Sequence, residues 1–209
     1  MDQNMSTILI VDDSTMIVDV FVAMLQRHGY ETLSAYGGDE ALEVLKSARP
    51  DLILLDIMME PRDGWSTLTA IKENPEFTEI PVMMLTAKQL NPKEAQQYGS
   101  LIEDYIMKPT THKQLYEAVD YVLSRRETIA EGIKKAREKG LDAELIEEYE
   151  HLSTSVDVSR RLLHLLSSTY RVDGTDLTIS KNIVKAIDNI EESITLQDQR
   201  LKELKTMIA

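Results

Sequence analysis

Residues 7–13 read Thr-Ile-Leu-Ile-Val-Asp-Asp, a short apolar run that ends in two acidic side chains. Four similar apolar runs follow, at residues 32–35, 52–55, 81–85 and 105–107. Short, nearly continuous runs of β-branched residues, Leu and Met are typical of parallel strands that are covered on both faces. Amphipathic stretches separate the runs and predict helices over residues 14–27, 39–48, 65–73, 92–98 and 112–123. This alternation predicts an α/β fold with a doubly wound, five-stranded parallel sheet.

Charged and polar side chains follow the predicted strands at the point where each strand ends. Asp12 and Asp13 follow the first strand, Asp56 the third, Thr86 ends the fourth and Lys108 follows the fifth. The carboxyl ends of parallel strands share the edge of the sheet where ligands bind. Three carboxylates crowded together there repel one another, so they need either a cation or raised pKa values, and Mg²⁺ prefers such oxygen ligands. One Mg²⁺ ion together with the Lys108 ammonium would balance the three negative charges.

These residues, in this order and spacing, resemble the receiver domain of two-component response regulators over about residues 5–126. The resemblance implies a flavodoxin-like sheet with the strand order 2-1-3-4-5. It implies that Asp56 is the phosphoacceptor and that Mg²⁺ is the cofactor. Asp13, Asp56 and the backbone carbonyl of Met58 would bind the ion, and Asp12 would assist through water.

The same resemblance assigns roles to three further residues. Lys108 would pair with the Asp56 carboxylate and later with the phosphoryl group, while Thr86 and Tyr105 would form a switch pair. The implied partners are a sensor histidine kinase or a histidine phosphotransfer protein. The chain would then be a signalling protein, and its only catalysis would be its own phosphorylation and dephosphorylation.

The loop after Asp56 departs from the family pattern. It reads Ile-Met-Met-Glu-Pro, so that Pro61 stands one position later than is common in the family. Met58 and Lys88 occupy positions that influence how water reaches the acyl phosphate in the family. We therefore expect a phosphoryl lifetime that differs from that of the fast-cycling chemotaxis regulators.

Residues 127–209 contain no Pro and no strand-like run, so we expect a receiver domain over residues 1–126 and a helical output or dimerisation region after it. Two apolar series with heptad spacing predict an antiparallel hairpin that turns near residues 172–178. Each series has one polar interruption, Ser159 in the first and Gln197 in the second. The first series is Leu145, Tyr149, Leu152, Val156, Leu163, Leu166 and Tyr170, and the second is Ile183, Ile187, Ile190, Ile194, Leu201, Leu204 and Ile208.

The heptad spacing also continues from Leu115 to Ala136, which would extend the fifth predicted helix toward the hairpin. A two-helix hairpin buries too little surface to be stable alone. The tail is therefore expected to form a three-helix bundle or to dimerise into a four-helix bundle. We expect the tail to associate with a second copy as a homodimer and to contact a downstream protein. The sequence does not identify that protein.

Other classes of function are weighed against the signalling switch. A phosphorelay intermediate could pass the phosphoryl group to a phosphotransfer partner or to His151 or His164 of the tail, although their surroundings show no convincing match to phosphotransfer bundles. Phosphatases of the haloacid dehalogenase type carry Asp-x-Asp after the first strand, whereas this chain has Asp12-Asp13-Ser14 there. The sequence therefore disfavours a phosphatase of this type.

Composition disfavours a DNA-binding regulator or a membrane protein. The net charge is −13, and the tail alone, with 16 acidic and 12 basic residues, carries −4. A general attraction to nucleic acid or to anionic lipid is therefore not expected. The chain has no Cys, which excludes disulfides and thiolate metal sites. Without a long apolar segment or a leader-like start, a soluble cytoplasmic protein is expected.

Overall fold

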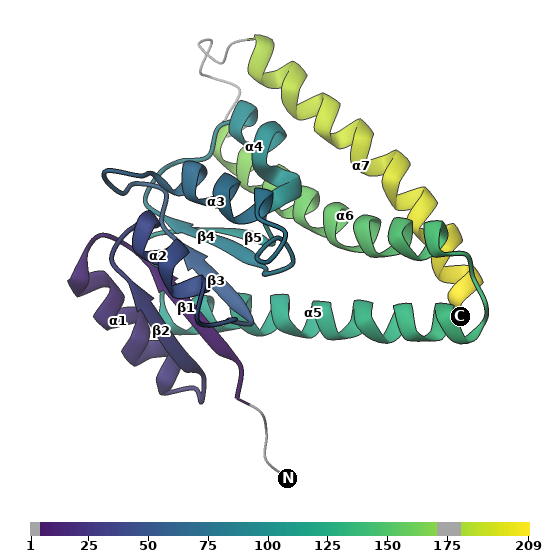
Figure 1. Cartoon of the computed structure of the whole chain (residues 1–209). Coiled ribbons are helices and arrows are strands. Elements are labelled where there is room, and N and C mark those ends of the chain that lie inside the picture. Colours follow the sequence, from purple (N-terminus) through teal and green to yellow (C-terminus); the bar gives the residue numbers. More distant parts are fainter. Residues whose placement is uncertain (1–4, 171–180) are drawn as a thin grey trace. The chain divides into compact units, whose positions relative to one another are not determined.

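A computed structural model describes residues 5–170 and 181–209 of the chain (Figure 1). The strands are β1 (Thr7–Val11), β2 (Glu31–Ala35), β3 (Leu52–Leu55), β4 (Val82–Thr86) and β5 (Asp104–Met107). The helices are α1 (Thr15–Gln26), α2 (Gly38–Leu45), α3 (Gly64–Glu73), α4 (Pro92–Tyr98), α5 (His112–Glu138), α6 (Ala143–Tyr170) and α7 (Lys181–Ile208), with a short 3₁₀ turn η1 (Gly99–Leu101). Each predicted strand and helix is present, with ends that shift by a few residues.

The five strands form one parallel sheet in the order β2-β1-β3-β4-β5, which confirms the predicted topology. Val11 at the end of β1 lies opposite Leu55 at the end of β3. Thr86 at the end of β4 lies opposite Met107 at the end of β5. This register brings the residues that follow β1, β3 and β5 to the same edge of the sheet.

Contacts divide the chain into two compact units, Met1–Gln89 with Leu101–Leu123, and Leu90–Ser100 with Ser124–Ala209. The core of the first unit lies where the central strands pack against α1 and the first part of α5. Its buried side chains are Ile8, Ile10, Val18, Phe21, Leu25, Leu52, Leu54, Met83, Leu85, Leu115, Val119 and Val122. The near-complete burial of both faces of β1, β3 and β4 explains why these strands read as continuous apolar runs.

The second unit contains α4, the last part of α5, and the antiparallel helices α6 and α7. One end of the α6–α7 hairpin shares an apolar core with α5, formed by Ile129, Ala136, Ile146, Tyr149, Leu152, Val156, Leu201, Leu204 and Ile208. We call this set the distal core. The predicted hairpin is therefore present, and α5 runs on to Glu138 because its later apolar residues are buried there. The predicted turn at residues 172–178 lies outside the described residues.

The two heptad series predict most of the buried side chains of α6 and α7. Tyr149, Leu152, Val156 and Leu166 are buried on α6, and Ile187, Ile194, Leu201, Leu204 and Ile208 on α7. Near the end of α6 the buried position is Leu162, whereas the predicted Leu163 is only partly covered. Over the ranges that the structure describes, no helix combines the length and apolar character needed to cross a bilayer.

Candidate functional site

The Lys108 ammonium connects two carboxylates at the strand ends of the first unit. Its Nζ lies 3.1 Å from Asp56 Oδ1 and also forms a short contact with Asp12 Oδ2. Both carboxylate residues are buried, with exposed fractions of 3% for Asp12 and 5% for Asp56. Burying two carboxylates is costly unless they are paired, so the ammonium stabilises both of them. The Lys108 backbone N–H donates to the Thr86 carbonyl at 2.8 Å, which fixes Lys108 beside the end of β4.

Backbone amides orient the three acidic side chains. The Ser14 N–H donates to Asp12 Oδ1 at 2.9 Å, and the Met58 N–H donates to Asp56 Oδ2 at 2.9 Å. Asp13 is exposed, and its Oδ2 accepts a longer hydrogen bond of 3.3 Å from the Glu60 N–H. The loop that follows β3 therefore contacts both Asp13 and Asp56.

Gly64, at the start of α3, packs directly against the backbone of Asp56. A Cβ at this position would lie 2.1 Å from the Asp56 carbonyl oxygen, and the Gly64 N–H donates to the Ile57 carbonyl at 2.9 Å. Only glycine permits this approach without a shift of the backbone that carries Asp56. In the sequence, Asp63-Gly64 separates two predicted elements at a distance from Asp56 that fits the family, but nothing there predicts this contact. The loop also contains a cis peptide bond between Glu60 and Pro61.

Thr86 and Tyr105, the predicted switch pair, both contact the loop after β4. Thr86 is fully buried, and its Oγ1 accepts a hydrogen bond of 3.2 Å from the Lys88 N–H. The Tyr105 hydroxyl donates to the Lys88 carbonyl at 2.5 Å. The Tyr105 ring is buried and stacks on Trp65, with 6.5 Å between the ring centroids. Sequence reasoning missed Trp65, which no spacing or motif singled out.

The donor set at this edge fits a hard divalent ion. Asp12, Asp13 and Asp56 offer carboxylate oxygens, and the backbone at Met58 is held beside Asp56. No group of three or more acidic or histidine side chains in residues 5–170 and 181–209 forms a preassembled metal cage. Mg²⁺ commonly binds one or two carboxylates and keeps several waters, so such a cage is not required.

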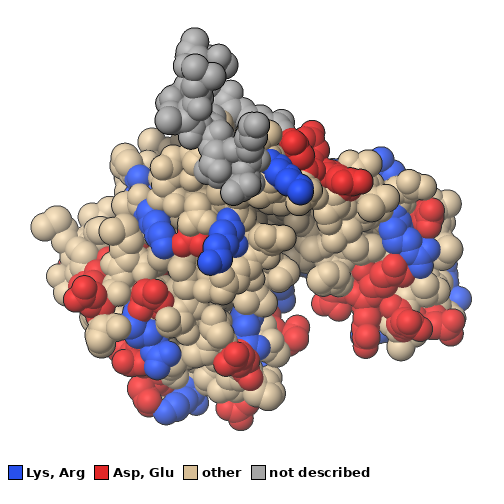
Figure 2. All heavy atoms as spheres, turned by 90° about the horizontal axis from the view of Figure 1, so that it is seen from above, with Lys and Arg blue, Asp and Glu red and all other residues tan. Residues whose placement is uncertain are grey.

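The basic residues on the face shown in Figure 2 do not form a cluster. Lys and Arg side chains there lie among Asp and Glu, and one part of this face is mainly acidic. Several basic side chains are engaged in ion pairs, including Arg160 with Asp198 and Arg200 with Glu148. Among the described residues, this face therefore offers no continuous basic area of the kind that contacts phosphate backbones.

Comparison with known proteins gives two family matches. Residues 8–120 match the family described as "Response regulator receiver domain", and residues 125–209 match "Metanogen output domain 2". The protein PilH of Pseudomonas aeruginosa is 30% identical over 120 residues, which cover 57% of this chain and 99% of PilH.

Solved structures give similar matches. The N-terminal domain of a response regulator receiver protein from Methanoculleus marisnigri JR1 is 64% identical, with a TM-score of 0.49, and the match covers 56% of this chain and 96% of that one. The response regulator TrrA of Thermotoga maritima, solved in complex with Mg(2+)-BeF, is 29% identical, with a TM-score of 0.51, and the match covers 56% and 99%.

The family match and the sheet order β2-β1-β3-β4-β5 place residues 8–120 in the class of two-component signalling receivers. The chain belongs to the response regulator receiver domain family, through residues 8–120. Receiver domains take part in signalling together with histidine kinases or phosphotransfer proteins. The helical region, through residues 125–209, matches a separate family model, that of an output domain.

Proposed function

We propose that this chain is a response regulator that accepts a phosphoryl group on Asp56 and thereby changes the protein contacts of its helical region. The observation that carries the proposal is the Lys108 ammonium, which reaches the buried carboxylates of Asp12 and Asp56 from the end of β5. Phosphoryl transfer depends mainly on positioning and on stabilisation of negative charge. A fixed cation beside a buried carboxylate supplies both.

The reaction begins when an Asp56 carboxylate oxygen attacks the phosphorus of a phosphohistidine or of a small phosphodonor. A bond from this oxygen to phosphorus forms as the bond from phosphorus to the donor's nitrogen or oxygen breaks, and the donor leaves with that electron pair. Lys108 orients the carboxylate before the attack and faces the phosphoryl charge afterwards. The Thr86 hydroxyl then donates a hydrogen bond to a phosphoryl oxygen.

The metal ligands proposed for this site are Asp13, Asp56 and the Met58 carbonyl, with Asp12 acting through water. When bound, Mg²⁺ would supply charge neutralisation for the phosphoryl oxygens. Hydrolysis by water at phosphorus returns Asp56 and inorganic phosphate, and this ends the signal. Residues at the positions of Met58 and Lys88 influence, in the receiver family, how water reaches the acyl phosphate, and this supports a lifetime unlike that of fast-cycling chemotaxis regulators.

The lone Trp65 offers a direct test, because its ring stacks on Tyr105 in the same unit. We expect beryllofluoride, a phosphoryl mimic, to change Trp65 fluorescence only when Mg²⁺ is present. The Asp56→Asn variant should give no change. An equal response from that variant would show that the mimic acts elsewhere and would refute the assignment of Asp56.

A phosphorelay step to the tail is the second candidate, because His151 and His164 are both exposed on α6. Acyl phosphates are hydrolysed in both acid and alkali, whereas phosphohistidine is labile in acid but survives strong alkali. An alkali-stable phosphoryl group that disappears in a His151→Gln, His164→Gln double variant would support the relay. Complete loss of the label in alkali would exclude it.

Self-association through the helical region also belongs to the proposal. The distal core is completed by α5 of the same chain, so a second copy is not needed to bury it. Leu196 and Met207 nevertheless expose 66% and 48% of their surface on α7. These two side chains are the surface that a second copy would cover in a homodimer.

A further inference from the structure

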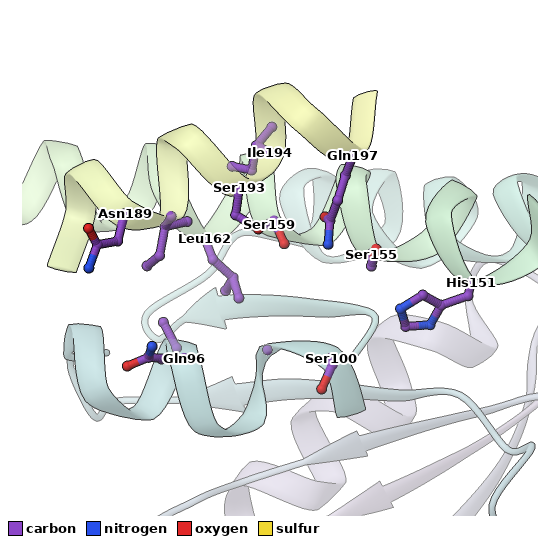
Figure 3. Close-up of a pocket in the computed structure, with 13 residues that line it drawn as sticks. Gln96, Ser100, His151, Ser155, Ser159, Leu162, Asn189, Ser193, Ile194 and Gln197 are labelled. Carbon is purple, nitrogen blue, oxygen red and sulfur yellow. The ribbon is translucent and has the colours of Figure 1, made fainter. Parts of the chain in front are cut away.

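The second unit contains a cavity of about 230 Å³ where α4 lies against α6 and α7 (Figure 3). A water molecule occupies about 30 Å³ in the liquid, so the cavity has room for about seven waters or for one small organic molecule. Gln96, Ser100 and Asn189 line it and are exposed, so its mouth is open to solvent. A solute can therefore enter the cavity without a rearrangement of the helices.

The lining of this cavity combines polar and apolar side chains. Ala95, Leu162, Ile190 and Ile194 supply apolar contacts. Among the described residues that line the cavity, none is Asp, Glu, Lys or Arg, and none is Phe, Tyr or Trp. The polar side chains come from α4, η1, α6 and α7, and they are Gln96, Ser100, His151, Ser155, Ser159, Asn189, Ser193 and Gln197.

Two of these polar residues interrupt the heptad pattern of the hairpin. Ser159 and Gln197 stand where the series of α6 and α7 each predict an apolar residue, and both are half-buried. A polar residue at such a position lowers the stability of helix pairing. Both interruptions line the same cavity, where they face Gln96 of α4 (Figure 3). The polar groups that weaken the pairing are therefore gathered at the one place where a solute can reach them.

The Ser155 hydroxyl adds a hydrogen-bonding group that the protein leaves unused. Ser155 lines the cavity, and its hydroxyl oxygen is buried without a hydrogen-bond partner among the described residues. An unpaired buried hydroxyl costs free energy, and a ligand that supplies the missing hydrogen bond recovers it. Ser155 lies one helical turn before Ser159, so both hydroxyls stand on the same side of α6.

The lining determines the chemistry of a suitable ligand. An ionised solute would lose hydration here without Asp, Glu, Lys or Arg to pair with, so an uncharged solute is favoured. A flat aromatic ring would find no Phe, Tyr or Trp to stack on among the described lining residues. Hydroxyl groups suit Ser, Asn and Gln, because each of these side chains both donates and accepts hydrogen bonds. The C–H groups of such a ligand would contact Leu162 and Ile194.

We propose that the cavity among α4, α6 and α7 is a binding site for a small uncharged polyol, up to the size of a monosaccharide. The ligand contacts all three helices and stabilises their packing. All residues of the site belong to the second unit, and binding does not depend on phosphorylation of Asp56. The helical region thereby responds to the concentration of a solute in addition to the proposed signal at Asp56.

Saturation-transfer NMR on the full chain tests the proposal, with D-glucose and D-mannitol as probes. We expect a saturable signal from at least one of them, whereas the general exclusion of polyols from protein surfaces gives none. D-glucuronate and D-mannonate carry a carboxylate in place of one CH₂OH group and should bind at least about tenfold more weakly than their parent compounds. The absence of a saturable signal from both probes would overturn the proposal. Equal or tighter binding of the carboxylates would overturn the assignment of an uncharged ligand.

Ser159→Leu locates the binding site, because it restores the apolar heptad position and fills part of the cavity. We expect binding to weaken by about tenfold or more while the thermal midpoint is kept or raised. Gln197→Leu makes the same kind of change on α7 and should act in the same direction. Ser168→Leu, at an exposed position of α6 outside the lining, is the matched control and should bind as the parent does.

The outcomes for this site and for Asp56 are distinguishable. Unchanged affinity in Ser159→Leu and Gln197→Leu, with both variants folded, would show that the polyol binds elsewhere and would overturn the assignment of the cavity. The Asp56→Asn variant should bind the polyol as the parent does. Loss of binding in that variant would contradict the independence of the two sites.

Discussion

Lys108 is the residue on which the candidate site depends. Its ammonium is the cation that the structure places between the buried carboxylates of Asp12 and Asp56. Breaking a buried pair leaves an uncompensated charge and typically costs about 3–5 kcal/mol. Lys108 is therefore expected to matter for stability as well as for phosphoryl transfer.

Lys108→Gln tests this expectation. We expect the free energy of unfolding at neutral pH to fall by about 3–5 kcal/mol and Mg²⁺ to restore part of it, because the ion replaces the missing positive charge. Urea unfolding with and without Mg²⁺ measures both effects. Lys113→Gln is the control, since its pair with Glu117 is exposed and spans 3.7 Å. An equal, small loss in both variants would contradict the role of Lys108.

Gly64→Ala tests the backbone packing beside Asp56. The added Cβ would lie 2.1 Å from the Asp56 carbonyl oxygen, so the loop must move and the carboxylate with it. We expect a lower thermal midpoint and slower phosphoryl uptake from acetyl phosphate. Gly37→Ala is the matched control, because a Cβ there meets no atom within 4 Å. Similar rates for both variants would show that the close approach does not position Asp56.

At the residue scale, the sequence predicted the site residues that lie at the ends of strands. It did not predict the residues whose contacts depend on the path of a loop. Asp12, Asp56, Thr86 and Lys108 could be placed at one edge because the ends of parallel strands coincide. The contact of Gly64 with Asp56 and the bond from Tyr105 to Lys88 each join a residue of one element to a residue of a neighbouring loop. No periodicity encodes such contacts.

At the scale of elements, ion pairs join α6 and α7 along the hairpin. Arg200 forms a two-pronged pair with Glu148, with distances of 2.8 and 2.7 Å. The hydrogen bond from Arg200 holds the pKa of Glu148 below its usual range. The pair therefore stabilises the folded state above the ordinary Glu pKa, and this contribution is lost as the pH falls through the lowered pKa.

Arg200→Gln tests this linkage. We expect the variant to be less stable than the parent at pH 7, with a difference that shrinks below about pH 5 as Glu148 protonates. Thermal unfolding across this pH range measures the difference. The Arg160→Gln variant, which removes the pair with Asp198, should behave in the same direction but to a smaller extent, because Lys202 lowers the pKa of Asp198 most and Arg160 lowers it further. A difference in stability between parent and variant that stays constant with pH would contradict the linkage.

Heptad spacing predicted the hairpin and the continuation of α5, because a repeat over several turns records one buried face. It could not show that α4 would cover the other end of the hairpin. Helix α4 is short, from Pro92 to Tyr98, and its sequence carries no repeat that marks a partner. Its place among the tail helices depends on tertiary packing at Leu90, Ala95 and Gly99.

At the scale of the whole molecule, self-association can be tested through the exposed apolar residues of α7. We expect light scattering to give about twice the chain mass at high concentration. Leu196→Glu with Met207→Glu should return the chain mass, because charges would enter the interface. A constant single-chain mass for the parent would exclude the homodimer and leave the three-helix distal core as a monomeric unit.

The central claim is that Asp56 carries the phosphoryl group, and mass spectrometry of the intact chain tests it most directly. With acetyl phosphate and Mg²⁺, we predict the addition of one phosphoryl group that hydroxylamine removes and that the Asp56→Asn variant does not acquire. Stoichiometric labelling of that variant, or a parent chain that stays unlabelled with Mg²⁺ present, would contradict the account.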